Sequence, residues 1–321
     1  ISISYIKVNM WKRINEMYIN SISEYLDRLE EFGKEYPNAP LMPNTTSNTF
    51  LFRGMEDREY KLLPSVYREV KDQVDEATII NSKYLCFSNE IGILRNFIQD
   101  ASAYVPQLDT NDIVRWAELA QHHGVPTRFL DWTENPLVAL YFACESNKNS
   151  DAVVWVLHKR NYLHYANKHD ENRFKWKNQY ATNEDAIKAL LTVSPRDGVK
   201  YSQLWRLPLV YTPYYFDHRM SAQASWFMVW GTEKRALEEL IDDSSFMKYE
   251  PPIDGIRSFG IPQEERFIYR FFIHQSEKQM IMRQLDRMGI HAKMLFPGLD
   301  GIGKRIERTY RFDYNEICRN F

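Results

Sequence analysis

The feature that most constrains the fold is a set of short apolar runs separated by unequal stretches of helical pattern. Each run has the length and the β-branched or aromatic content of a strand. The runs are Thr49–Gly54, Ala152–His158, Leu207–Tyr211, Ser225–Trp230 and Arg266–Ile273. A doubly wound sheet needs strands and helices in regular alternation, and this chain lacks it. We therefore expect an α+β fold, with a mixed or antiparallel central sheet and surrounding helices.

Helices are predicted where apolar residues recur at helical spacing next to capping residues. Ser21 with Glu24 forms a capping box, and Asn135-Pro136 places a cap residue before a first-turn proline. The predicted helices cover 21–33, 76–103, a segment from Thr110 toward His122, 135–144, 184–191 and a segment behind Ser276 and Gln279. The middle, 164–203, is otherwise charged and irregular. Because no linker is visible, we expect one main domain.

Composition excludes several classes of protein. The 321 residues carry 41 Lys+Arg and 43 Asp+Glu, a formal charge of −2, which disfavours a nucleic-acid coat or a polybasic membrane surface. Aromatic residues make up 14%, too many for a disordered chain. No apolar run approaches the ~18 residues of a membrane span. Cys86, Cys144 and Cys318 lie far apart, and Ile1–Met10 lacks a signal-peptide core, so we expect a cytoplasmic protein.

The common signatures of cofactor and metal enzymes are absent. The sequence holds no P-loop, no dinucleotide-binding glycine motif, no H-E-x-x-H and no G-x-S-x-G. His122 and His123 are adjacent, and neighbours on a helix point in different directions. They would make poor joint ligands for one ion, since metal-binding pairs usually lie one turn apart. We expect no metal.

Three segments place polar residues in apolar surroundings. In the first, Arg53 ends a strand and Gly54 follows it. The planar guanidinium can bind anion oxygens in pairs, and glycine allows close backbone approach. Such an arginine can also pair with a buried carboxylate, so the segment alone leaves both interpretations open.

The second segment is Gln121–Thr133, QHHGVPTRFLDWT. Its Gly and Pro predict a tight turn. Arg128 and Asp131 lie three residues apart and could form a buried pair or line a polar site. Trp132 could stack on a base or nicotinamide ring, or lie in the core. The following helix N-terminus suits a phosphate.

The third segment is Arg219–Phe227, which leads into a strand. Gln223 could bind an amide or a ribose hydroxyl, or it could cap a strand edge. Further along, Gln263 precedes two adjacent carboxylates, Glu264 and Glu265, which are typical of a solvated turn.

Together these segments resemble the FRG domain family, named for a Phe/Tyr-Arg-Gly motif, here Phe52-Arg53-Gly54. The longest family signature is similar to Gln121–Thr133 continued through Asn135-Pro136. A third block pairs an Arg with a downstream Gln and Phe, here Arg219, Gln223 and Phe227, although members often carry Gly where this chain has Ala224-Ser225. The resemblance implies a helical lead-in at 1–47, an FRG domain at 48–305 and a packed tail at 306–321.

The family name supplies no reaction, and its members look like bacterial and phage-encoded cytoplasmic proteins. The order of motifs resembles that of ADP-ribosyltransferases, which implies an ADP-ribosyltransferase-like fold and NAD as substrate. On this hypothesis Arg53 clamps the NAD phosphates or ribose, Thr133 orients a ribose and Asp131 is catalytic. Gln223, or a carboxylate such as Glu264 or Glu265, stabilises the positive transition state. The remaining ligand-binding candidates are Gly54, Gln121, His122, Arg128, Trp132, Arg219 and Phe227.

Two alternatives stay open. The first is a non-catalytic module that binds a nucleotide or phosphate ligand through Arg53, Arg128 and Arg219, in a bacterial or phage stress or defence system with a protein partner or target. The second is a nucleic-acid enzyme, which the balanced charge disfavours. A carboxylate converging on the arginines, such as Asp131 or Glu118, would favour catalysis over binding.

Overall fold

The computed structural model describes residues 17–35, 50–68, 87–146, 148–173, 183–193, 196–241 and 267–319. Four residues considered in the sequence lie outside these ranges: Cys86, Gln263, Glu264 and Glu265.

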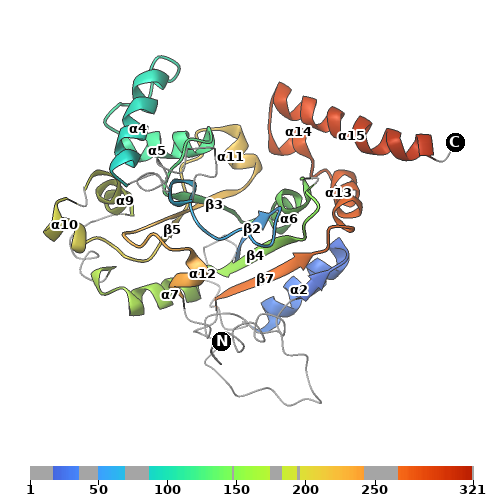
Figure 1. The fold of residues 1–321 in the computed structure, drawn as a ribbon, viewed down its shortest axis with the longest axis horizontal. Coiled ribbons are helices and arrows are strands. Elements are labelled where there is room, and N and C mark those ends of the chain that lie inside the picture. The colour runs from blue at the N-terminus through green and yellow to red at the C-terminus, as the bar shows by residue number, and fades with distance from the viewer. Residues whose placement is uncertain are drawn as a thin grey trace, which may run out of the picture.

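Among the described residues, the core of the fold is a seven-stranded mixed sheet with the order β1-β7-β4-β2-β3-β6-β5 (Figure 1). Neighbours pair antiparallel except β1 and β7, which are parallel. The strands are β1 (Met17–Ile19), β2 (Phe50–Met55), β3 (Phe129–Thr133), β4 (Ala152–His158), β5 (Leu209–Tyr211), β6 (Ser225–Val229) and β7 (Ile268–Ile273). The predicted α+β class with a mixed sheet is confirmed.

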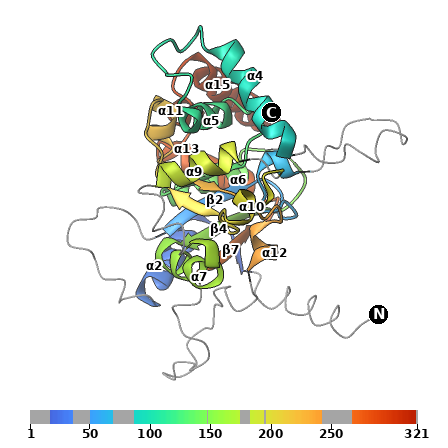
Figure 2. The ribbon, with the colours of Figure 1, turned by 90° about the vertical axis from the view of Figure 1, so that its left-hand side faces the viewer.

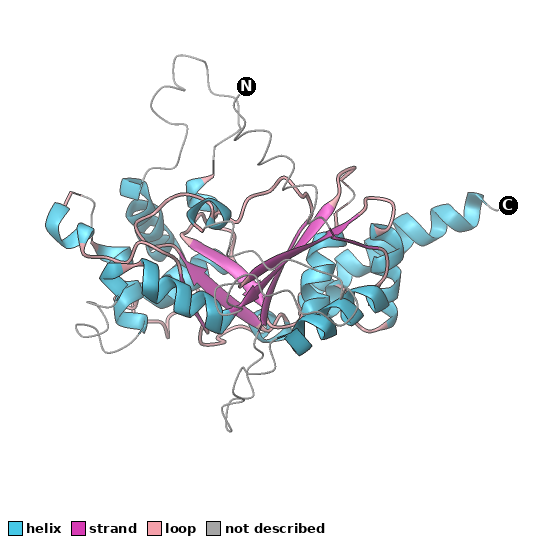
Figure 3. Ribbon diagram, turned by 90° about the horizontal axis from the view of Figure 1, so that it is seen from below, coloured by secondary structure: helices cyan, strands magenta, loops and turns pink. Residues whose placement is uncertain are grey.

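Helices surround this sheet, and Figure 3 shows the strands as a band between two groups of them. The longest helix, α15, extends away from the body toward the C-terminus (Figure 1). The helices are α2 (Ile22–Glu35), α4 (Phe87–Ala101), α5 (Ile113–His122), α6 (Pro136–Cys144), α7 (Lys159–His169), α9 (Asn183–Thr192), α10 (Gly198–Ser202), α11 (His218–Ala222), α12 (Leu237–Leu240), α13 (Lys278–Arg287), α14 (Ala292–Leu295) and α15 (Leu299–Arg319), with a 3-10 turn at Ser65–Tyr67.

Strand alternation divides the apolar side chains into clusters on the two faces of the sheet. One cluster joins β1, β7, β4 and β2 to α2, α6 and α13. A second joins β3, β6 and β5 to α4, α5 and α9, which lie side by side in both views (Figures 1 and 2). These two clusters lie on the same face of the sheet. The third cluster lies on the other face and contains Trp132, Trp155 and Trp230. The many aromatic residues therefore fill a large core.

Helix α6 shows how local sequence fixes a close helix–sheet contact. Asn135 caps it by accepting hydrogen bonds from the backbone N–H groups of Leu137 (2.9 Å) and Val138 (3.4 Å), as the Asn-Pro signal predicts. The helix lies directly on β2 at Gly54, where an added Cβ would stand 1.8 Å from the carbonyl oxygen of Ala139. Gly54 is therefore required for this packing, because any side chain there would overlap the α6 backbone.

Some predicted element ends are wrong. Asp112, not Thr110, caps α5, because its side chain accepts the N–H of Arg115 at 3.2 Å. The box expected at Ser276 and Gln279 does not form, since α13 begins at Lys278 with no side-chain cap. Helix α7 (Lys159–His169) extends into 164–203, the segment that we expected to be irregular at this end. Helix α15 (Leu299–Arg319) continues through residue 305, where we expected the domain to end and the tail to begin.

Candidate functional site

The first part of the site lies where β2 and β3 meet. These strands pair at a single register position, Phe52 opposite Thr133. Beyond that pair, the Nη1 group of Arg53 donates a hydrogen bond to the backbone carbonyl of Asp131 and lies 4.0 Å from its Oδ2. The Arg53 side chain is 17% exposed and that of Asp131 is 54% exposed. The fold thus brings Arg53 and Asp131 together and leaves the carboxylate open to solvent.

Burial lowers the pKa of the Arg53 guanidinium to about 10. The charge of Arg68 also lowers this pKa, while the carboxylate of Asp131 raises it. At neutral pH the side chain still carries its positive charge, and the neighbouring carboxylate compensates part of it.

A network from α5 fixes the Asp131 carboxylate. The Nε2 group of Gln121 donates to Asp131 Oδ2 at 2.7 Å, and Gln121 Oε1 accepts from the hydroxyl of Thr127 at 2.5 Å. The Thr127 oxygen in turn accepts the N–H of Phe129 at 3.1 Å. We call Arg53, Gln121, Thr127 and Asp131 the arginine–carboxylate cluster. Its acidic member is both accessible and held in one orientation, as a catalytic carboxylate must be.

The second part of the site adjoins the first at the end of α5. His122 follows Gln121, and its Nε2 lies 3.2 Å from Oδ2 of Asp217. Asp217 caps α11, since its Oδ1 accepts the N–H of Arg219 at 2.6 Å. The Arg219 guanidinium lies over the ring of Phe296, 4.6 Å from the centroid. Polar groups from β2, β3, α5 and α11 are therefore brought near one another, since the charges of Asp131, Asp217 and Arg219 all act on the His122 ring.

Other predicted site residues hold the fold around these groups. The Thr133 hydroxyl donates to the backbone carbonyl of Gln223 at 2.6 Å and accepts the N–H of Asn135 at 3.0 Å. The Gln223 side chain donates to the carbonyl of Leu295 at 3.0 Å. Both residues tie the β3–α6 junction to α11 and α14. Through these hydrogen bonds they hold in place the elements that carry the neighbouring cluster.

Three predicted ligand-binding residues lie in the interior. Arg128 is fully buried and makes a bidentate ion pair with Glu90. Its Nε donates to Oε1 at 2.8 Å and its Nη2 donates to Oε2 at 2.7 Å. The pair considered between Arg128 and Asp131 is therefore wrong, because Arg128, just before β3, is buried against Glu90, while the Asp131 side chain is half exposed. Trp132 and Phe227 are buried in opposite apolar clusters, so neither ring presents an open face.

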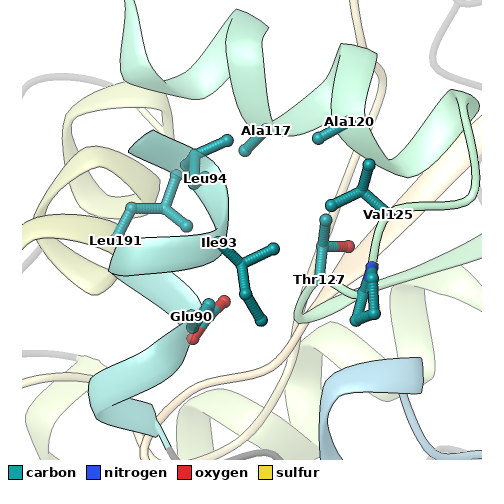
Figure 4. A pocket seen from close by; sticks show the side chains of 9 residues that line it. Glu90, Ile93, Leu94, Ala117, Ala120, Val125, Thr127 and Leu191 are labelled. Atoms are coloured by element: carbon teal, nitrogen blue, oxygen red, sulfur yellow. The ribbon is translucent and has the colours of Figure 1, made fainter. Parts of the chain in front are cut away.

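A small cavity lies next to the buried Arg128–Glu90 pair, between α4 and α5. Figure 4 shows its lining, which is mostly apolar and includes Ile93, Leu94 and Val125. Its volume of about 10 Å³ gives room for one water molecule at most. It cannot hold a nucleotide, so this cavity is a packing defect and not the ligand site.

Asp217 is a member of the site that the sequence predictions missed. A signal for it existed, because Asp217 directly precedes the short helical segment that carries Arg219, and Asp is a preferred N-cap residue. Thr127 lies within the segment Gln121–Thr133, but no role in the site was predicted for it. Within the described ranges no group of three His, Cys, Asp or Glu side chains gathers as a metal site would require, and no helix there has the length and apolarity of a membrane span.

The comparisons with known proteins bear on the family. The model of the FRG domain family matches residues 48–152. The chain therefore carries an FRG domain, and the resemblance seen in the sequence is confirmed. The match contains Arg53, Gln121 and Asp131, and it ends at β4, before Asp217 and Arg219. The searches of curated proteins and of solved structures returned no match.

Proposed function

We propose that this FRG-domain protein cleaves NAD, releasing nicotinamide and passing the ADP-ribosyl group to water or to a protein target. The observation that carries the proposal is the half-exposed carboxylate of Asp131 beside the guanidinium of Arg53, at 4.0 Å. A cation paired with an accessible, fixed carboxylate suits a substrate that has anionic phosphates next to a carbon that becomes positive.

The roles follow from charge. Breaking the bond between C1′ of the ribose and the nicotinamide nitrogen leaves positive charge on the sugar, which a nearby carboxylate opposes. Asp131 takes this role in the proposal, and Gln121 keeps its carboxylate oriented. Glu264 and Glu265, the other carboxylates considered, lie outside the described residues. Arg53 binds a phosphate or a ribose oxygen, because its planar fork forms paired hydrogen bonds to oxygens.

Arg219 extends the positive charge available to a dinucleotide, since it comes from α11 and lies close enough to His122 to act on its pKa. Thr133 and Gln223 keep their place in the proposal as residues that hold β3 against α11 and α14. Arg128, Trp132 and Phe227 are given no contact with the substrate, because they are buried.

The second candidate is a binding module that recognises a nucleotide or phosphate ligand without cleaving it. The pair of arginines, Arg53 and Arg219, supports it, while the adjacent carboxylate supports catalysis. For either function we propose a cytoplasmic protein that acts in a bacterial or phage-encoded stress or defence system. Its partner or target would be another protein.

The test is nicotinamide release from NAD, measured with and without added protein acceptors. We expect Asp131→Asn and Arg53→Ala to reduce the rate by at least 10²-fold, as loss of one electrostatic contact to a transition state commonly does. Matched controls are Asp100→Asn and Arg160→Ala, because both side chains are exposed on helices. Binding of NAD without any release would favour the binding module, and neither binding nor release would refute the proposal.

A further inference from the structure

His122 and Asp217 form a pair that the proposed function has not used. The imidazole is held between α5 and the N-terminus of α11, with its side chain 11% exposed. The Asp217 carboxylate uses Oδ1 to cap α11 and Oδ2 to meet His122 Nε2 at 3.2 Å. A carboxylate anchored by a backbone N–H cannot swing away, so it fixes the orientation of the ring.

The neighbouring charge also selects which ring nitrogen carries the proton. The Asp217 carboxylate lies 3.2 Å from Nε2 and stabilises an N–H group on that nitrogen, because an ionised carboxylate has no proton to donate. The lone pair of a neutral imidazole then lies on Nδ1, which has no hydrogen-bond partner within the described part of the chain. Of the two adjacent histidines, only His122 has this arrangement. His123 is exposed and lies near Phe97, with ring centroids 6.4 Å apart.

The groups that face His122 come from every element around it. They are Asp217 and Arg219 from α11, Asp131 from β3, the neighbouring His123, and the ring of Phe216, whose centroid is 6.5 Å away. Burial and Arg219 lower the pKa of His122 below its usual value, while Asp217 and Asp131 act in the opposite direction. The ring is therefore mainly neutral at pH 7 and able to accept a proton.

We propose that His122 is the general base of the reaction and that Asp217 is the residue that positions it; this inference rests on the proposed cleavage of NAD. An oxygen lone pair of the acceptor, water or a hydroxyl side chain, forms the new bond to C1′. The bond from C1′ to nicotinamide breaks, and its electron pair leaves with the neutral nicotinamide. The proton of the acceptor oxygen passes to Nδ1 of His122, and Asp217 stabilises the resulting imidazolium. Asp131 stays ionised and opposes the charge on the sugar.

The experiment compares nicotinamide release by the full chain and three variants between pH 4.5 and 9. His122→Gln can still donate to Asp217 but has no basic nitrogen, so we expect its rate to fall by about 10²–10⁴-fold. His123→Gln is the matched control and should behave as wild type. Asp217→Asn retains a good helix cap. Its rate should fall less, and its inflection should move to lower pH, because the charge that raises the pKa of His122 is gone.

Azide separates a base from a structural residue, because this anion attacks C1′ without a proton to lose. We expect azide to restore turnover in His122→Gln but not in Asp131→Asn. A rate and pH profile for His122→Gln equal to those of His123→Gln would overturn the inference while leaving NAD cleavage intact, and so would failure of azide to restore turnover. If wild type releases no nicotinamide with any acceptor, the proposed function itself fails and the role of His122 falls with it.

Discussion

A buried glutamate in α5 makes the stability of the protein depend on pH. Glu118 is 2% exposed, and its Oε1 accepts the hydroxyl of Tyr211 at 2.7 Å. Its Oε2 is buried and has no hydrogen-bond partner among the described residues. Burial raises the pKa of Glu118 from 4.5 to about 7, and the nearby carboxylates of Asp112 and Glu184 add to the rise. Above neutral pH the fold therefore holds a poorly solvated charge.

The size of the effect follows from the pKa. A carboxyl whose pKa is higher in the folded state favours folding fully below pH 4.5, and this contribution is lost as pH rises through about 7. Raising the pKa from 4.5 to about 7 corresponds to roughly 3 kcal/mol at 1.36 kcal/mol per unit. Glu118→Gln removes the charge and keeps an oxygen for Tyr211. We expect the variant to equal wild type near pH 4.5 and to be more stable by roughly 3 kcal/mol at pH 8.

The assay is urea unfolding of wild type and Glu118→Gln at several pH values between 4.5 and 8. Glu171→Gln serves as the control, because Glu171 is an exposed helical glutamate. Its difference from wild type should stay close to zero throughout. A stability difference for Glu118→Gln that does not change with pH would refute the reasoning, because it would show that the variant acts through packing and not through charge.

Three further substitutions test the packing that holds the site. Gly54→Ala should destabilise the protein by at least 1–3 kcal/mol in thermal unfolding, because its Cβ would meet the α6 backbone; unchanged stability would contradict that contact. Ala224→Gly should stabilise by about 1 kcal/mol, because Ala224 has a φ of +45°, which glycine adopts without strain; a loss of stability would contradict this. Glu90→Gln should cost about 3–5 kcal/mol by leaving the buried charge of Arg128 without its carboxylate, and adding Arg128→Met should recover much of it. Failure of the double variant to recover would show that the pair contributes more than charge balance.

Local signals in the sequence were sufficient for most elements. Capping by Asn135 and the apolar run Ala152–His158 reappear as predicted, because both depend on neighbours within a few residues. The motif blocks also identified the FRG domain and named Arg53, Gln121 and Asp131, which the fold brings together. Arg53 and Asp131 could be found because polar side chains among apolar neighbours are conspicuous, and Gln121 because it belongs to the same motif block as Asp131.

Partners distant in sequence were decided only by the tertiary structure. Arg128 pairs with Glu90 and not with Asp131, because the sheet carries it into the core beside α4. Trp132 and Phe227 face the interior because of strand pairing, which the sequence does not state. Asp217 reaches His122 only because the fold places the N-cap of α11 beside the last residue of α5. Short motifs in the sequence identified the FRG domain and the kinds of residue at the site. Long-range packing determined which of those side chains are buried and which are exposed.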